Sequence, residues 1–211
     1  MIVPEPIERY AEEHTTPPSA LLARLAEETR ATLERPEMLT GPIEGRLLEF
    51  LVHASAARRV LELGTFSGYA SISMAAALPP GGRVDTCEVE ERHAEVARRY
   101  IEEAGYADRI TVHLGPALET IERLEGSFDL VFVDADKPSY VAYYEALLPR
   151  LLPTGLMAVD NTLWSGRVLE PDDSEPTRAI VTFNEHVRND PRVISVMLTI
   201  RDGITLIRRR A

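Results

Sequence analysis

The chain has 211 residues, and 34 acidic against 23 basic side chains give it a formal net charge of −11. This length suits one domain with a small extension, and the hydrophobic share of 45% is sufficient for an apolar core. The acidic balance disfavours nucleic acid as a partner, because phosphate binding requires basic patches. The sequence shows no apolar run of the roughly 20 residues that a membrane helix needs, and no secretory leader. The single cysteine favours a cytoplasmic protein. No membrane partner is expected.

The first 58 residues are predicted to be helical. Apolar side chains recur at helical spacing over residues 17–34, and a second helix is expected over residues 43–57. We therefore interpret residues 1–58 as a helical extension of the same domain, serving as a cap or dimer element. Residues 59–211 form the predicted core.

From residue 59, short apolar strands alternate with helices. The expected strands are 59–63, 83–88, 110–113, 128–133, 156–159, 193–198 and 204–208. The expected helices are 69–78, 91–104, 117–124, 139–152 and 176–187. Continuous apolar strands indicate a parallel sheet covered on both faces. The short turn at 201–203 predicts that the last strand is antiparallel, so the fold class is a Rossmann-like, doubly wound, mostly parallel α/β sheet of seven strands.

A glycine turn follows the first predicted strand. It begins with Glu62, and Gly64 and Gly68 allow the backbone to approach a ligand closely. The spacing is not the G-x-G-x-x-G of a dinucleotide site. Glu88 ends the second strand, the position of a carboxylate that binds a ribose diol. A tight capped turn and a solvated Glu88 are the plain alternatives. Together, the two features favour an adenosyl ligand without a diphosphate, such as S-adenosylmethionine.

Polar residues also follow the fourth and fifth predicted strands. Asp134 ends one, and Asp160 and Asn161 follow the next. If the strands are neighbours, these side chains form an all-oxygen cluster of the kind that binds Mg²⁺, or Ca²⁺ or Mn²⁺. Three protein ligands would leave positions for water and substrate. The alternative is a set of unconnected polar turn residues, since Asp and Asn are common after strands.

Lys137 is the only lysine among the 23 basic residues, and it lies three positions beyond Asp134. A nearby divalent cation would depress the pKa of its amine by like-charge repulsion, which makes Lys137 a candidate general base. The alternative is a surface lysine paired with Asp136.

The motifs resemble the cation-dependent class I O-methyltransferases of the caffeoyl-CoA and catechol type. The similarity spans about residues 36–210. It rests on the blocks 38–40, 44–45, 62–69, 133–137, 160–164, 190–192 and 202–205. The resemblance implies the class I methyltransferase fold and a homodimer.

Carried over by position, the resemblance implies three groups of site residues. The metal ligands are Asp134, Asp160 and Asn161. The cofactor residues are Thr40, Glu62, Gly64, Ser71, Glu88, Ala117, Asp134 and Asp136. The substrate residues are Met38, Lys137, Asn161, Trp164 and Asp202. Lys137 is the implied base, and Asp134 is catalytic with it.

The chain departs from the family pattern in two places. Ala70 stands where the family has a serine that contacts the cofactor, and Ser71 follows one residue late. The stretch 165–177 is shorter and more acidic than in the plant enzymes that use CoA esters. The chain therefore looks like the bacterial branch, whose acceptors are smaller catechols, including intermediates of secondary metabolism.

The resemblance implies methyl transfer from S-adenosylmethionine to one hydroxyl of a vicinal aromatic diol. Methylation of a hydroxycinnamoyl-CoA thioester is one alternative, and a non-catalytic module that binds S-adenosylmethionine or a metal is another. An NAD-dependent short-chain oxidoreductase is disfavoured, because the phosphate-binding glycine spacing and a Tyr-x-x-x-Lys pair are missing. The sequence leaves open the acceptor, the hydroxyl that is methylated and the physiological metal.

Overall fold

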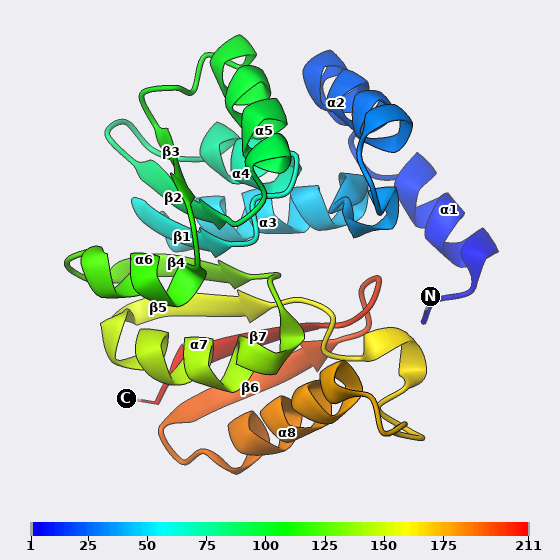
Figure 1. The fold of residues 1–211 in the computed structure, drawn as a ribbon, viewed down its shortest axis with the longest axis vertical. Helices are drawn as coiled ribbons and strands as arrows, with labels where there is room; N and C mark the ends of the chain where they lie inside the picture. The colour runs from blue at the N-terminus through cyan, green and yellow to red at the C-terminus, as the bar shows by residue number, and fades with distance from the viewer. Residues whose placement is uncertain (1, 211) are drawn as a thin grey trace.

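The computed structural model describes residues 2–210 and confirms the α/β fold (Figure 1). Its seven-stranded sheet has the order β3-β2-β1-β4-β5-β7-β6. The strands are β1 (Arg59–Leu63), β2 (Arg83–Glu88), β3 (Ile110–Leu114), β4 (Phe128–Val133), β5 (Leu151–Val159), β6 (Val193–Leu198) and β7 (Ile204–Arg209). Strands β1 to β5 pair in parallel. As predicted, β7 is antiparallel; it lies between β5 and β6 and opposes both.

Eight helices of the described chain surround this sheet. They are α1 (Glu5–Glu13), α2 (Ala20–Thr32), α3 (Gly41–Ser55), α4 (Tyr69–Ala76), α5 (Glu91–Glu103), α6 (Ala117–Arg123), α7 (Tyr140–Leu147) and α8 (Glu175–Asn189). The predicted helices at 17–34 and 43–57 correspond to α2 and α3. Residues 1 and 211, the outer ends of the two predicted segments, lie outside the described residues. None of the described helices is long and apolar enough to cross a membrane.

One local prediction is wrong, and one helix was not predicted individually. A single helix over 139–152 was expected, but α7 ends at Leu147, a short 3-10 helix with Pro149 follows, and β5 begins at Leu151. Pro149 has no N–H with which to continue a helical ladder. Leu151 is buried and pairs with Phe128, so burial against β4 extends the strand. Helix α1, which buries none of its side chains, was not predicted individually.

Apolar side chains on both faces of the sheet form two cores. On one face, Leu48 and Val52 of α3 pack with Met74 of α4 and Tyr100 of α5 against the sheet. On the other face, the core under α6, α7 and α8 includes Phe183. Each core removes apolar side chains from water, the main favourable term in folding. Figure 1 shows these helix layers on opposite sides of the strands.

The strand register brings the site together. Leu63 at the end of β1 pairs with Val133 of β4, which pairs with Val159 of β5. The residues that follow these strand ends are therefore neighbours at the carboxyl edge of the sheet, where ligands of such folds bind. The helix layers close the two faces, so this edge is where the cofactor and substrate residues meet.

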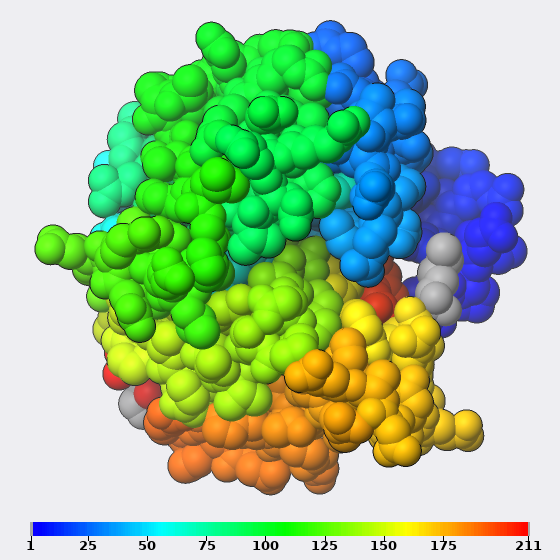
Figure 2. Space-filling model, viewed as in Figure 1, coloured from blue at the N-terminus to red at the C-terminus, as the bar shows by residue number. Residues whose placement is uncertain are grey.

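The turn between β6 and β7 lies near this edge. In Figure 2 this turn (red) is visible between the N-terminal segment (blue) and the segment that follows β5 (yellow). Arg201 in the turn donates to the carbonyl oxygen of Leu39 at 2.9 Å. The next residue, Asp202, accepts a hydrogen bond from the backbone N–H of Ser165. The turn thus joins parts of the chain that are distant in sequence.

Candidate active site

Asp134 and Asp160 continue the backbone ladder at the ends of β4 and β5. The N–H of Asp134 donates to Leu63 at 2.8 Å, and the N–H of Asp160 donates to Val133 at 2.9 Å. Asn161 has a positive φ of 59°, and its amide donates to Oδ2 of Asp160 at 3.0 Å. The structure therefore brings the three residues of the predicted metal group together.

The Asp160 carboxylate is not satisfied within the protein. Asp160 is 5% exposed, and its Oδ1 atom has no hydrogen-bond partner. Burial, followed by the charge of Asp134, raises the pKa of Asp160 to about 7. A buried carboxylate oxygen without a partner is unfavourable unless a proton or a cation compensates it. The orphaned oxygen and the all-oxygen donor set fit a hard divalent cation.

Lys137 belongs to the same cluster. Its Nζ donates to Oδ1 of Asp134 at 3.0 Å and to the hydroxyl of Tyr140 at 2.7 Å. Its side chain is only 11% exposed. Asp136 instead accepts hydrogen bonds from Ser139 and Tyr143. The alternative of a surface lysine paired with Asp136 is therefore wrong, and the amine faces the predicted metal ligands.

The glycine turn after β1 is packed tightly against this cluster. Gly64 has a φ of 99°, and a Cβ atom on it would lie 2.0 Å from the carbonyl oxygen of Asp134. The N–H groups of Gly64 and Thr65 donate to the carbonyl oxygen of Cys87 at the end of β2. Only glycine permits this approach and this backbone conformation, so Gly64 sets the spacing between the turn and Asp134.

Glu62 lies buried beneath the turn. One carboxylate oxygen accepts from the Ser71 hydroxyl, while Oε1 has no partner. Burial raises the pKa of Glu62 to about 8, although bonds from Ser71 and Thr86 oppose this shift. A buried carboxylate with an unpartnered oxygen fits a ligand that carries positive charge. S-adenosylmethionine carries two such groups, an ammonium and a sulfonium. Ser71, considered as a cofactor contact, lies behind Glu62 and supports it.

Glu88 organises the turn through backbone hydrogen bonds. Oε2 accepts from the N–H of Phe66 at 2.7 Å, and Oε1 accepts from Val89 and Glu90 at 2.9 Å each. The alternative of a solvated side chain is wrong, because Glu88 is 7% exposed. A carboxylate has about four acceptor positions, so one position on Oε2 stays open for a ribose hydroxyl. Thr40 and Ala117 are buried at the starts of α3 and α6.

Of the predicted acceptor residues, Trp164 lies near Lys137. The Lys137 Nζ is 5.9 Å from the centre of the Trp164 ring, and the indole N–H donates to Thr177 at 3.2 Å. Met38 is partly exposed on a 3-10 helix (Pro36–Met38). Arg201 binds the segment beside Met38 to the turn that carries Asp202, so these elements belong to one region.

Sequence reasoning missed three residues of this cluster. Glu44 of α3 is 1% exposed, its Oε1 has no partner, and burial and the Asp160 charge raise its pKa well above the usual value. Arg201 donates to the other Glu44 oxygen at 3.0 Å. Tyr140 is buried and donates to the carbonyl oxygen of Asp160 at 3.2 Å. Tyr140 could have been found by its position three residues after Lys137; Arg201 carries no local signal.

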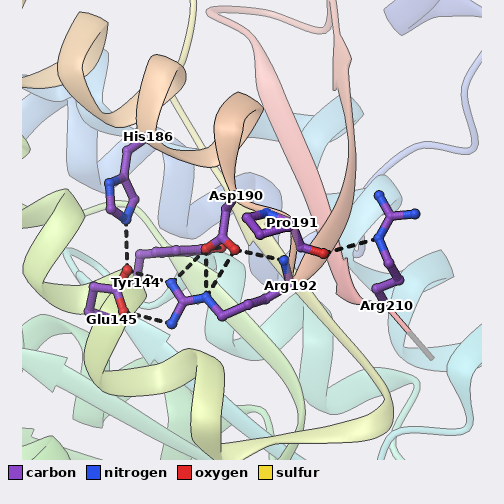
Figure 3. Close-up of polar contacts among 7 residues, drawn as sticks. All are labelled: Tyr144, Glu145, His186, Asp190, Pro191, Arg192 and Arg210. Carbon is purple, nitrogen blue, oxygen red and sulfur yellow. Dashed lines mark hydrogen bonds and ion pairs between the residues drawn. The ribbon is translucent and has the colours of Figure 1, made fainter.

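A second cluster of ligand-type side chains lies at the end of α8 (Figure 3). Atoms of Glu145, His186 and Asp190 lie within 4.8 Å of one another. However, the Arg192 guanidinium donates to Glu145 and to Asp190 at 2.6 Å each, and His186 bonds Glu145 at 2.7 Å. Because a fixed cation already compensates both carboxylates, this cluster is a structural ion-pair network.

Comparison with known proteins agrees with this arrangement. Residues 12–210 match the model of the family described as O-methyltransferase. A caffeoyl-CoA O-methyltransferase 1 of Eucalyptus globulus is 37% identical over 82% of this chain and 75% of its own length. A catechol O-methyltransferase domain-containing protein 1 of Mus musculus is 39% identical over 83% of this chain and 70% of its own.

A solved structure supports the same relationship. It is the O-methyltransferase TomG from Streptomyces achromogenes, involved in tomaymycin synthesis and bound to S-adenosylmethionine. Its TM-score is 0.90 at 31% identity, over 98% of this chain and 96% of that chain. The similarity therefore extends over the whole fold and not only over the site.

Proposed function

This chain belongs to the O-methyltransferase family and uses S-adenosylmethionine, and on this premise we propose that it methylates one hydroxyl of a vicinal aromatic diol with the help of a divalent cation. The observation that carries the proposal is the buried, unpartnered Oδ1 of Asp160, in the cluster in which the Lys137 amine donates to Asp134. Deprotonation of a catechol requires a cation and a titratable amine close to the same hydroxyl group.

Asp134, Asp160 and Asn161 would hold the cation. When bound, Mg²⁺ or a similar ion lowers the pKa of a coordinated phenol and orients its oxygen. Lys137, as the neutral amine, accepts the phenol proton on Nζ. Tyr140 and Asp134 hold that nitrogen in place through their hydrogen bonds. The phenolate oxygen then bonds to the methyl carbon while the carbon–sulfur bond breaks, which yields the methyl ether and S-adenosylhomocysteine.

Other residues of the chain would position the methyl donor. The unpartnered Oε1 of Glu62 suits the cationic part of S-adenosylmethionine, and the open acceptor position on Glu88 suits a ribose hydroxyl. Gly64 lets the turn lie directly against Asp134, and Thr40, Ala117 and Asp136 complete the proposed cofactor set. Holding the methyl group in line with the acceptor supplies much of the rate enhancement.

The direct test is methyl transfer to a simple catechol before and after removal of divalent cations. We expect activity to disappear in EDTA and to return when Mg²⁺ is restored in excess. Full activity in EDTA would contradict the role of the cation. Calorimetry with S-adenosylmethionine, followed by turnover, separates an enzyme from a non-catalytic binding module.

The size of the acceptor distinguishes two candidate substrates. The name of the Eucalyptus relative favours a CoA thioester, whereas the segment after Trp164 favours a smaller catechol. In that segment Glu170, Asp172, Asp173 and Glu175 are exposed, and they would repel the phosphates of CoA. We expect kcat/KM to be higher for a free catechol such as caffeic acid than for caffeoyl-CoA, and the reverse order would favour the thioester.

The assembly and biological setting of the enzyme are also part of the proposal. The family resemblance supports a homodimer, which light scattering of the purified protein tests directly. The involvement of TomG in tomaymycin synthesis supports a role of this enzyme in secondary metabolism. A panel of catechol-containing metabolites, with the products assigned by NMR, would identify the acceptor and the methylated hydroxyl.

A further inference from the structure

Helix α3 carries a buried carboxylate, Glu44, to which neither the family resemblance nor the proposed mechanism assigns a role. Glu44 is 1% exposed and lies next to Asp160, whose charge acts on it directly. We propose that Glu44 is a positioning residue of the cation site, and that Arg201 holds it with one oxygen turned away and the other available to the site. This inference rests on the proposed cation role of Asp134, Asp160 and Asn161.

The hydrogen bonds of Glu44 divide its two oxygens. Oε2 accepts from Arg201 Nη1 at 3.0 Å, and the same nitrogen donates to the carbonyl oxygen of Leu39 at 2.9 Å. Oε1 is buried and has no partner. Arg201 is itself held by the β6–β7 turn, at a positive φ of 49°, so the guanidinium and the carboxylate are fixed from two distant parts of the chain.

The unpartnered oxygens occur together. Oδ1 of Asp160 and Oε1 of Glu44 are both buried without a hydrogen bond, and the two carboxylates are neighbours. The two carboxylates repel each other when both are ionised, and Arg201 compensates only Glu44, through its other oxygen. One cation near both removes this repulsion, so Glu44 should increase the affinity of the site for a divalent ion.

The charges of the cluster support this assignment. Asp134, Asp160 and Glu44 supply three negative charges, while Arg201 supplies one fixed positive charge. Without the Glu44 charge, Arg201 would be an uncompensated cation beside the metal ligands and would oppose ion binding.

The experiment is a calorimetric titration of chelator-treated protein with Mg²⁺ alone, without cofactor or acceptor. Outer groups that orient metal ligands typically change affinity by roughly 10- to 100-fold, and we expect Glu44→Gln to raise the Kd for Mg²⁺ within that range. The matched control is Glu49→Gln on the same helix, because Glu49 is paired with Arg46 at the surface. Its Kd should equal that of the unmodified protein.

Two further variants separate a direct role from simple charge or folding effects. Glu44→Gln combined with Arg201→Gln restores the net charge, and we expect its Kd to stay raised because the Glu44 carboxylate is still missing. Glu44→Asp keeps the charge on a shorter side chain, so we expect a several-fold increase in the Kd for Mg²⁺. This variant replaces Glu44→Gln in the test if circular dichroism shows that Glu44→Gln does not fold.

The outcomes distinguish this inference from the proposed function. If the unmodified protein binds Mg²⁺ and Glu44→Gln or Glu44→Asp binds it equally well, the role of Glu44 is overturned while the metal site stands. Return of the double variant to the original Kd also overturns a direct role for Oε1. If the unmodified protein binds no divalent ion, both proposals fail together.

Discussion

Two carboxylate clusters of this protein differ in how their charges are compensated. At the end of α8, hydrogen bonds from Arg192 hold the pKa values of Asp190 and Glu145 below their usual range (Figure 3). At the carboxyl edge of the sheet, burial raises the pKa values of Asp160 and Glu62 to about 7 and about 8. The same residue type is thus stabilised as an anion in one place and left to be compensated by a ligand in the other.

The difference teaches how to recognise a site among charged clusters. Ligand-type atoms gather closely in the α8 cluster, but every carboxylate there already has a partner within the protein. The cluster at the sheet edge retains buried oxygens without partners, and such atoms require an explanation in a native fold. Missing compensation, rather than proximity of ligand atoms, marks the functional cluster.

Replacement of Lys137 should have the largest effect. An arginine keeps the charge but stays protonated near neutral pH, so Lys137→Arg should lower the methyl transfer rate by about 10²- to 10⁴-fold. Initial rates at saturating S-adenosylmethionine measure the change, and calorimetric binding of that cofactor checks that the site is intact. A variant with normal activity at neutral pH would show that Lys137 is not the base.

Replacement of Asp190 should affect stability and leave the reaction alone. Asp190→Ala removes the acceptor of the buried Tyr144 hydroxyl, now bonded at 2.7 Å, and a partner of Arg192. We expect the free energy of unfolding to fall by about 2 kcal/mol, as measured by urea denaturation. Methyl transfer by the folded variant should be unchanged, and a selective loss of activity would contradict the contrast between the clusters.

The α8 network also predicts a pH dependence with a definite sign. The pKa values of Asp190 and Glu145 are lower in the folded protein than in the unfolded chain, mainly because Arg192 donates to both. Their contribution is therefore complete above the unfolded values and is lost as the pH falls through the folded ones. The urea denaturation midpoint of the unmodified protein should decrease as the pH is lowered below about 4. The midpoint of Asp190→Ala should decrease less steeply.

Glu62 should show the opposite and smaller dependence. Its folded pKa of about 8 lies above the ordinary value of 4.5, so its burial costs stability as the pH rises from about 5 to 8. Glu62→Gln should remove this part of the slope, although Ser71 and Thr86 already offset some of the cost. The same variant should bind S-adenosylmethionine more weakly in calorimetry. An unchanged pH slope would contradict the assignment of Glu62 as an uncompensated carboxylate.

Much of the site could be predicted because it follows strand ends. Asp134 and Asp160 each come directly after an apolar strand, and the parallel register places such residues side by side. The end of α7 was misplaced because Leu151 and Leu152 continue an apolar pattern that suits either a helix or a strand. Only pairing with β4 decides between them.

The sequence by itself determined the order of the elements, the glycine turn and the position of the single lysine beside a strand end. Periodicity and strand-end chemistry act over a few residues, so they are readable along the chain. The tertiary structure decided which carboxylates have partners: it set Arg192 between Glu145 and Asp190, and Arg201 against Glu44 from the far end of the chain. Compensation of buried charge depends on contacts between distant segments, and therefore only the folded protein shows which carboxylates still need a ligand.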